Sequence, residues 1–209
     1  MKINRKTLDK MLIDSIQEDK KEYKLKSRGC SMYKKVGDYF VTIVMAITGM
    51  ESEKIRVTGY VKPYIIDDIF WDVFHMSGNS KAPMGLRANG AFKVDSLTVF
   101  SSTISYEKVE KIGIIAKDLL YQCHEKILHV IEEINDYNDF LLFARDIEDH
   151  GFFDYNLTYM LLLIYDKKYQ DARTIAEEQL LSGDHGRFKN EGKYIYEHIV
   201  DYCKLQLEL

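Results

Sequence analysis

Proline and cysteine are both scarce in this sequence. Among 209 residues there are 2 prolines and 3 cysteines. Because proline removes a backbone donor and breaks regular structure, its scarcity favours long helices and paired strands. Cys30, Cys123 and Cys203 lie far apart, with no C-x-x-C pair and no matching histidine spacing. This pattern argues against disulfides and a structural zinc site, and a chain of this length can bury a core without them.

Long apolar runs and an excess of positive charge are also lacking. The longest apolar run, Tyr159 to Tyr165, is far shorter than the roughly 20 residues that span a bilayer. The N-terminus, Met1 to Lys6, leads into a charged amphipathic stretch without the apolar centre of a signal peptide. The formal net charge of −4 argues against a nucleic-acid backbone as the main partner, and the basic residues between Lys20 and Lys35 are expected to form a solvated face. We therefore expect a cytoplasmic protein without a membrane or nucleic-acid partner.

The hydrophobic pattern of the first half predicts one helix followed by strands. Residues 4–19 place apolar side chains at helical spacing. Short strands are expected at 23–26, which Ser27-Arg28-Gly29 ends, and at 30–35. The strongest strand is 39–48, rich in β-branched and aromatic residues. In 54–62 apolar and polar residues alternate, as in an antiparallel strand with one buried face.

The connections after these strands follow from turn residues and proline. Gly49 to Ser52 is a plausible hairpin loop, and Pro63 ends the strand before it because it cannot donate to a ladder. Helical spacing returns over 64–76. Residues 77–90, rich in Gly, Asn and Ser, are expected to form a loop, and 91–106 returns to strand character.

From Glu107 onward the apolar period changes from two to about three and a half residues. The expected helices cover about 107–135, 137–149, 155–166, 168–181 and 188–207, with breaks at His150-Gly151 and Ser182-Gly183-Asp184. Residues 155–181 resemble one tetratricopeptide helix pair, but without a second copy a packed helical layer is favoured. The sequence thus predicts an α+β protein: an antiparallel sheet of four to five strands with flanking helices in residues 1–106, and a helical domain or layer, residues 107–209, packed against it.

No catalytic or cofactor motif is present. The sequence contains no G-x-x-x-x-G-K-[ST], G-x-G-x-x-G, G-x-S-x-G or H-E-x-x-H. His124 and His129 are five apart and so do not share a helix face, and Cys123 beside His124 is not a nucleophile–base pair. Lys81 and Arg87 could contact an anion, although a flexible connection is the preferred interpretation. We expect no metal and no cofactor.

Two acidic groups stand out. Asp68 and Asp72 lie one helical turn apart and could share a cation or bind a basic partner. Asp67 and Asp68 also fall in the first turn of the expected helix, where carboxylates favour the positive end of the helix dipole. That structural interpretation is favoured. A second acidic group, at residues 146–150, follows a helix C-terminus, and a solvated face is favoured there too.

One stretch of the chain resembles a known class of domain. Gly29 and Tyr33 precede the 39–48 strand, and Pro63-Tyr64 leads into Ile69-Phe70-Trp71. This order resembles an uncharacterised bacterial α+β domain family that includes immunity-like proteins of polymorphic toxin systems. The resemblance covers roughly residues 4–106. It implies a non-catalytic protein that occupies a toxin's surface, and it transfers no functional residues.

Two hypotheses of function remain open. The first is a non-catalytic protein-binding protein, an immunity or adaptor protein of a toxin system, whose exposed aromatic and acidic residues contact its partner. Its candidate binding residues are Tyr60, Tyr64, Asp67, Asp68, Trp71, Asp72 and His75. The second is a small intracellular enzyme with a site at the junction of sheet and helices, involving His75, Asp72 and residues 77–90.

Overall fold

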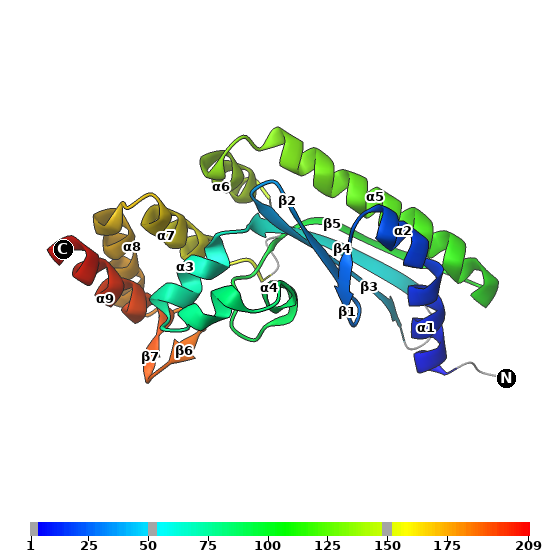
Figure 1. Cartoon of the computed structure of the whole chain (residues 1–209), viewed down its shortest axis with the longest axis horizontal. Helices are drawn as coiled ribbons and strands as arrows, with labels where there is room; N and C mark the ends of the chain where they lie inside the picture. Colours follow the sequence, from blue (N-terminus) through cyan, green and yellow to red (C-terminus); the bar gives the residue numbers. More distant parts are fainter. Residues whose placement is uncertain (1–3, 50–53, 148–151) are drawn as a thin grey trace. The chain divides into compact units, whose positions relative to one another are not determined.

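The computed structural model describes residues 4–49, 54–147 and 152–209, and the predicted α+β fold class is confirmed. The chain forms two compact units, each built from two segments. The first unit comprises Met1–Lys62 with Ser96–Asn135, and the second comprises Pro63–Asp95 with Asp136–Leu209. The boundary expected at 106/107 falls inside the first unit, because the long helix that follows it packs on the sheet (Figure 1).

The first unit contains a five-stranded antiparallel sheet in the order β1-β2-β3-β4-β5. The strands are β1 (Lys26–Arg28), β2 (Ser31–Val36), β3 (Tyr39–Thr48), β4 (Lys54–Pro63) and β5 (Leu97–Ser105). β3 begins and ends where the sequence predicted. The strand expected at 23–26 is displaced to β1, since Lys24 has a positive φ of 56° that interrupts extended structure before it. Ser27 and Arg28 of the expected break lie within β1, and Gly29, at φ 61°, forms the turn to β2 together with Cys30.

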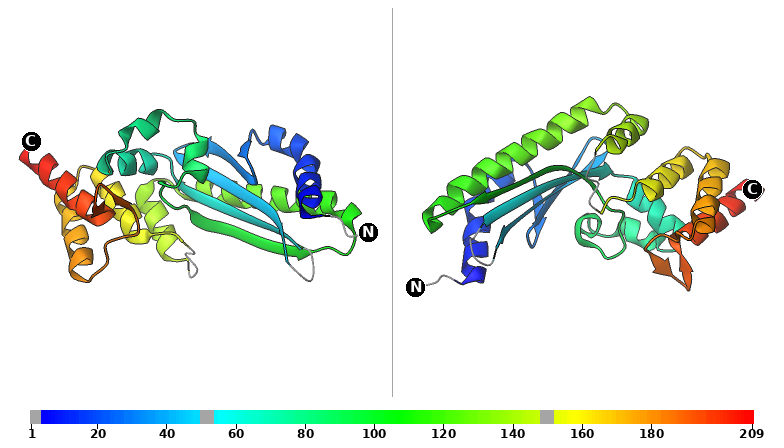
Figure 2. Two further views of the ribbon diagram at one scale, coloured as in Figure 1. Left: turned by 90° about the horizontal axis from the view of Figure 1, so that it is seen from below. Right: turned by 180° about the vertical axis from the view of Figure 1, so that it is seen from behind.

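The helices of this unit are α1 (Arg5–Ser15), α2 (Gln17–Glu22), the short 3₁₀ helix η2 (Val109–Lys111) and α5 (Ile112–Glu133). Of these, α1 and α5 pack on the sheet. Asn4 caps the N-terminus of α1, and its side chain accepts a hydrogen bond from the Thr7 N–H. The α5 helix lies along the strands (Figure 2), and a methyl group on Gly59 of β4 would stand 2.6 Å from Cys123 Sγ. The glycine therefore permits the close approach of α5 to the sheet.

The second unit is mostly helical. Its elements are α3 (Ile66–Val73), η1 (Ser77–Lys81), α4 (Gly85–Asn89), α6 (Tyr137–Arg145), α7 (Tyr155–Tyr165), α8 (Tyr169–Leu181), β6 (Lys189–Asn190), β7 (Lys193–Tyr194) and α9 (Ile195–Glu208). The expectation of a loop over 77–90 is wrong, because this segment forms η1 and α4. The helix expected from 188 begins only at 195. A hairpin of β6 and β7 precedes it, and Glu191 and Gly192 turn that hairpin with positive φ values of 49° and 83°.

The core of the second unit is built around α3. Ile66, Phe70, Val73 and Phe74 are fully buried there and belong to one cluster with buried side chains of α7, α8 and α9. The ring of Phe188, from the segment before β6, packs edge-on against Phe70 with centroids 4.9 Å apart. A residue far along the chain is thereby fixed next to α3.

Four of the sequence-based expectations fall wholly or partly outside the described residues. They concern the Gly49 to Ser52 loop, the end of the helix expected over 137–149, the acidic group at 146–150 and the break at His150-Gly151. Within the described residues, no helix is both long and apolar enough to cross a membrane.

Candidate functional site

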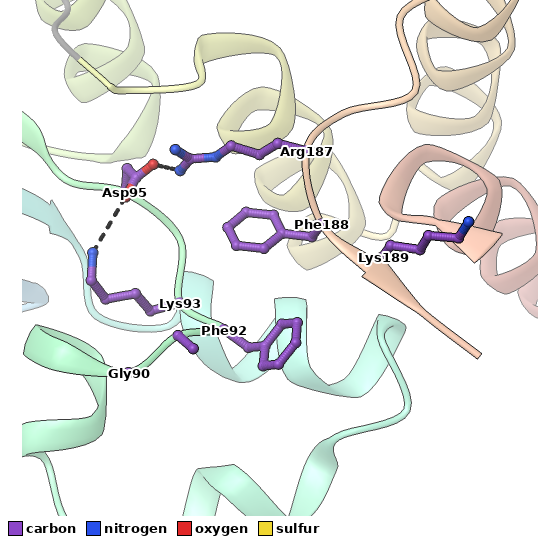
Figure 3. Close-up of a pocket in the computed structure, with 8 residues that line it drawn as sticks. Gly90, Phe92, Lys93, Asp95, Arg187, Phe188 and Lys189 are labelled. Carbon is purple, nitrogen blue, oxygen red and sulfur yellow. Dashed lines mark hydrogen bonds and ion pairs between the residues drawn. The ribbon is translucent and has the colours of Figure 1, made fainter. Parts of the chain in front are cut away.

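A cavity of about 360 Å³ in the second unit brings together two segments that are far apart in the sequence (Figure 3). We call it the basic pocket. Its lining consists of Gly90, Ala91, Phe92, Lys93, Asp95, Arg187, Phe188 and Lys189. The rings of Phe92 and Phe188 lie 6.5 Å apart between centroids. The pocket therefore combines aromatic surface with charged side chains.

The charges of the basic pocket centre on Asp95. Lys93 Nζ lies 3.3 Å from Asp95 Oδ1, and the Arg187 guanidinium pairs with the other carboxylate oxygen (Figure 3). Arg187 also lies over the Phe188 ring, 5.0 Å from its centroid. An ammonium has three N–H donors and a guanidinium five, whereas one carboxylate offers two acceptor oxygens. Donors therefore remain in excess at this site.

Burial weakens the solvation of both cations. It lowers the pKa of Lys93, an effect that the charge of Arg187 strengthens and the nearby Asp67 carboxylate opposes. Burial also lowers the pKa of Arg187. The ammonium of Lys189 is directed elsewhere, 5.0 Å from the centroid of the Tyr194 ring. Of the three cations in the lining, Lys93 and Arg187 thus contact Asp95, the one carboxylate there.

The α3 helix holds one wall of the basic pocket in place. The indole N–H of Trp71 donates to the Phe92 carbonyl at 2.6 Å, and the Val94 N–H donates to Asp67 Oδ1 at 2.9 Å. Both side chains are buried, at 1% and 0% exposure. Two hydrogen bonds to consecutive turns of one helix fix the backbone of residues 92–94, which otherwise has no regular structure.

Arg87 completes the network beneath this wall. Its guanidinium lies 3.7 Å from Asp67 Oδ2, donates to Asp68 Oδ1 at 2.6 Å and donates to the Tyr64 carbonyl at 3.1 Å. It also lies over the rings of Tyr64 and Trp71, with centroid distances of 4.2 and 4.9 Å. The Arg87 side chain is 4% exposed. It neutralises interior carboxylates and does not present its charge to a ligand.

The predicted binding residues therefore divide between interior and surface. Asp67 and Trp71 are interior residues, so the expectation that Trp71 is exposed is wrong. The reason is that Arg87 and residues 92–94 cover a second face of α3 besides its apolar face. Asp67 and Asp68 do lie in the first turn of α3, as predicted. Tyr64 and Asp68 are partly buried around Arg87. Tyr60 is half-buried on β4 of the first unit.

Asp72 and His75 are exposed, and each has its own partner. Asp72 accepts a hydrogen bond from the Tyr202 hydroxyl at 3.1 Å, and His75 Nδ1 lies 2.9 Å from Glu191 Oε2. Asp68 is held by Arg87, so Asp68 and Asp72 are engaged separately. Among the described residues no group of three or more His, Cys, Asp or Glu side chains could hold a metal ion.

Sequence reasoning missed Lys93, Asp95 and Arg187. The signal that could have indicated them is an aromatic residue beside a base in both segments, Phe92-Lys93 and Arg187-Phe188-Lys189. Such pairs are common, however, and nothing in the sequence links residues more than ninety positions apart.

The first unit contains a second polar cluster, around His124. Lys34 Nζ lies 2.8 Å from His124 Nε2 and donates to the Tyr23 carbonyl at 3.1 Å. The imidazole stacks on the Tyr23 ring with centroids 4.2 Å apart. Burial and then the Lys34 charge lower the pKa of His124, and contacts with Glu125 oppose this. Adjacent Cys123 stays a thiol, because burial raises its pKa to about 12.

We expect His124 to make the protein less stable in mild acid. A histidine whose pKa is lower in the folded state binds fewer protons there than in the unfolded chain, so stability falls as pH drops below the ordinary value of 6.5. Each unit of pKa difference corresponds to about 1.4 kcal/mol. Urea unfolding at neutral and mildly acidic pH should show a smaller loss for His124→Gln than for the wild type. Equal losses would contradict the assignment, and the exposed His129→Gln is the control.

Comparison of the chain with protein-family models, with curated proteins and with solved structures found no match.

Proposed function

We propose that this chain is a protein-binding protein and that its basic pocket receives an acidic side chain of the partner. The observation that carries the proposal is the excess of N–H donors on Lys93 and Arg187 over the acceptors of Asp95, beside two aromatic rings. A carboxylate of the partner would accept hydrogen bonds from these donors, and apolar groups beside it would cover Phe92 and Phe188.

The energetics favour an anionic group over a neutral one. Lys93 and Arg187 are partly desolvated, so an incoming carboxylate would replace solvation that burial has removed. The wall that carries Lys93 is fixed by Asp67 and Trp71, so binding would not have to order it. Asp95 keeps the two cations close together in the absence of a partner.

The identity of the partner follows only from the family resemblance. Residues 4–106 resemble immunity-like domains, and we therefore expect the partner to be a bacterial toxin. A toxin-like reading frame beside the gene would support this expectation, whereas a metabolic operon would count against it.

Fluorescence anisotropy with labelled hexaglutamate tests the pocket. We expect binding at low ionic strength that weakens as salt is added. Arg187→Gln or Lys93→Gln should reduce the affinity for hexaglutamate about fivefold or more. Each removes one ion pair between a partly exposed cation and a peptide carboxylate, and such a pair contributes about 1 kcal/mol. Lys168→Gln is the matched control. Lys168 is an exposed cation of the same unit and, like the pocket cations, it pairs with an aspartate, Asp166.

Two results would overturn the proposal. One is equal weakening by Lys168→Gln, which would indicate a non-specific charge effect. The other is binding of tripolyphosphate, weakened by Arg187→Gln, without any binding of hexaglutamate. That outcome would identify the pocket as a phosphate site instead.

A further inference from the structure

The two edges of the sheet in the first unit differ in how they are protected. An edge strand presents unpaired backbone groups to other chains, and charged residues or short length normally protect it. β1, at one edge, has three exposed residues, two of which are Lys26 and Arg28. β5, at the other edge, is nine residues long and carries neither a charge nor a proline. Figure 2 shows β5 as the outermost strand beside β4.

The composition of β5 favours strand pairing. Its sequence, LTVFSSTIS, is rich in β-branched and aromatic residues. A bulge between Gly59 and Tyr60 of β4 leaves Val99 as the extra residue of β5, so that regular geometry extends from Phe100 to Ser105. Among the described residues, β4 is the strand that pairs with this segment of β5.

The two faces of this segment have different character. Phe100 pairs with Gly59, whose side-chain position faces Cys123 and Ile127 of α5, so Phe100, Ser102 and Ile104 lie on the α5 side of the sheet. Phe100 and Ile104 are only partly buried. Ser101 and Thr103, on the opposite side, are exposed. Phe100 and Ile104 are thus left incompletely covered along the edge.

We infer that β5 pairs antiparallel with β5 of a second copy of this chain, joining two sheets across a two-fold axis at Ser102. In this register Phe100 faces Ile104 of the second copy on the α5 side, and Ser101 faces Thr103 of the second copy on the other side. Aromatic–aliphatic and Ser–Thr pairs are favourable cross-strand pairs. No like charges meet, because the segment has none, and a two-fold interface of this kind closes on itself.

A second copy fits this edge better than an unrelated strand does. The same five residues supply both sides of every pair, with apolar residues opposite apolar ones and hydroxyls opposite hydroxyls. Five residue pairs make a small interface, so we expect a reversible dimer with a dissociation constant of roughly 10–100 µM.

Sedimentation equilibrium over a range of concentrations tests the inference. The double variant Ser101→Lys with Thr103→Lys should be monomeric, with dimer affinity lowered at least about tenfold, since lysine would then face lysine across the axis. Both positions are exposed, and Thr103 lies opposite Arg56 of β4 in the same chain, so urea unfolding of the single copy should show a small loss of stability from this like-charge pair with the fold retained. Ser27→Lys on β1 is the control and should dimerise like the wild type.

Mixing opposite charges tests the register itself. The double-lysine variant mixed with Ser101→Glu, Thr103→Glu should form a heterodimer, because each lysine then faces a glutamate. A wild type that stays monomeric at all concentrations, a double-lysine variant that dimerises normally, or a mixture that stays monomeric would each overturn the inference.

Discussion

Replacement of Arg87 by methionine is expected to lower the free energy of unfolding by about 3–5 kcal/mol, the usual cost of removing one partner from a buried ion pair. The Arg87 side chain is 4% exposed, and Asp67 beside it is completely buried. Without the guanidinium, Asp67 keeps its hydrogen bond from the Val94 N–H but loses the positive charge of Arg87 at 3.7 Å. Asp68 and the Tyr64 carbonyl also lose donors.

Urea denaturation measures this loss, and an exposed arginine provides the comparison. Arg5 pairs with Asp9 at 3.3 Å, with both side chains about half exposed. Arg5→Met should therefore change stability by less than about 1 kcal/mol. Adding Asp67→Asn to Arg87→Met should restore part of the loss, because the second change removes a buried charge that has lost its guanidinium partner. If Arg87→Met cost no more than Arg5→Met, the buried network would not stabilise the fold.

The bounds of an element could be predicted from the sequence where its own residues and the turns beside it determine them. β3 has β-branched and aromatic residues throughout its length, and its predicted ends match the structure. The α7 and α8 helices agree closely because turns separate them from their neighbours. The β6–β7 hairpin was missed because its strands have two residues each and depend on positive φ values at Glu191 and Gly192. No apolar period marks such a turn.

The candidate site was harder to predict, because helical spacing gives the faces of a helix but not what covers them. The pattern of α3 separates an apolar face from Asp67, Asp68 and Asp72, which looks like one face towards a core and one towards solvent. In the structure Arg87 and residues 92–94 cover part of the second face. Asp67 and Trp71 of α3 thus support the basic pocket, while the residues that line it come from elsewhere.

Trp71→Phe should show how strongly α3 controls the pocket. Trp71 is 1% exposed, and its indole N–H donates to the Phe92 carbonyl at 2.6 Å. Phenylalanine would leave that carbonyl without this donor and a small void beside Arg87. We expect a loss of about 2–3 kcal/mol in the free energy of unfolding, combining the unmade hydrogen bond with the lost packing.

The informative measurement on Trp71→Phe is amide hydrogen exchange in the pocket wall, residues 92–94. Under native conditions the Val94 amide should exchange with solvent faster than in the wild type, because its segment has lost one of its two anchors. Hexaglutamate binding should weaken as well.

Leu161→Ala is the matched control: Leu161 is completely buried on α7 and does not line the pocket, so this variant should lose similar stability without either change. If the two variants behaved alike at Val94, the wall would be held by the general stability of the unit. An effect confined to Trp71→Phe would mean that a buried helix residue sets the geometry in which Lys93 meets its ligand.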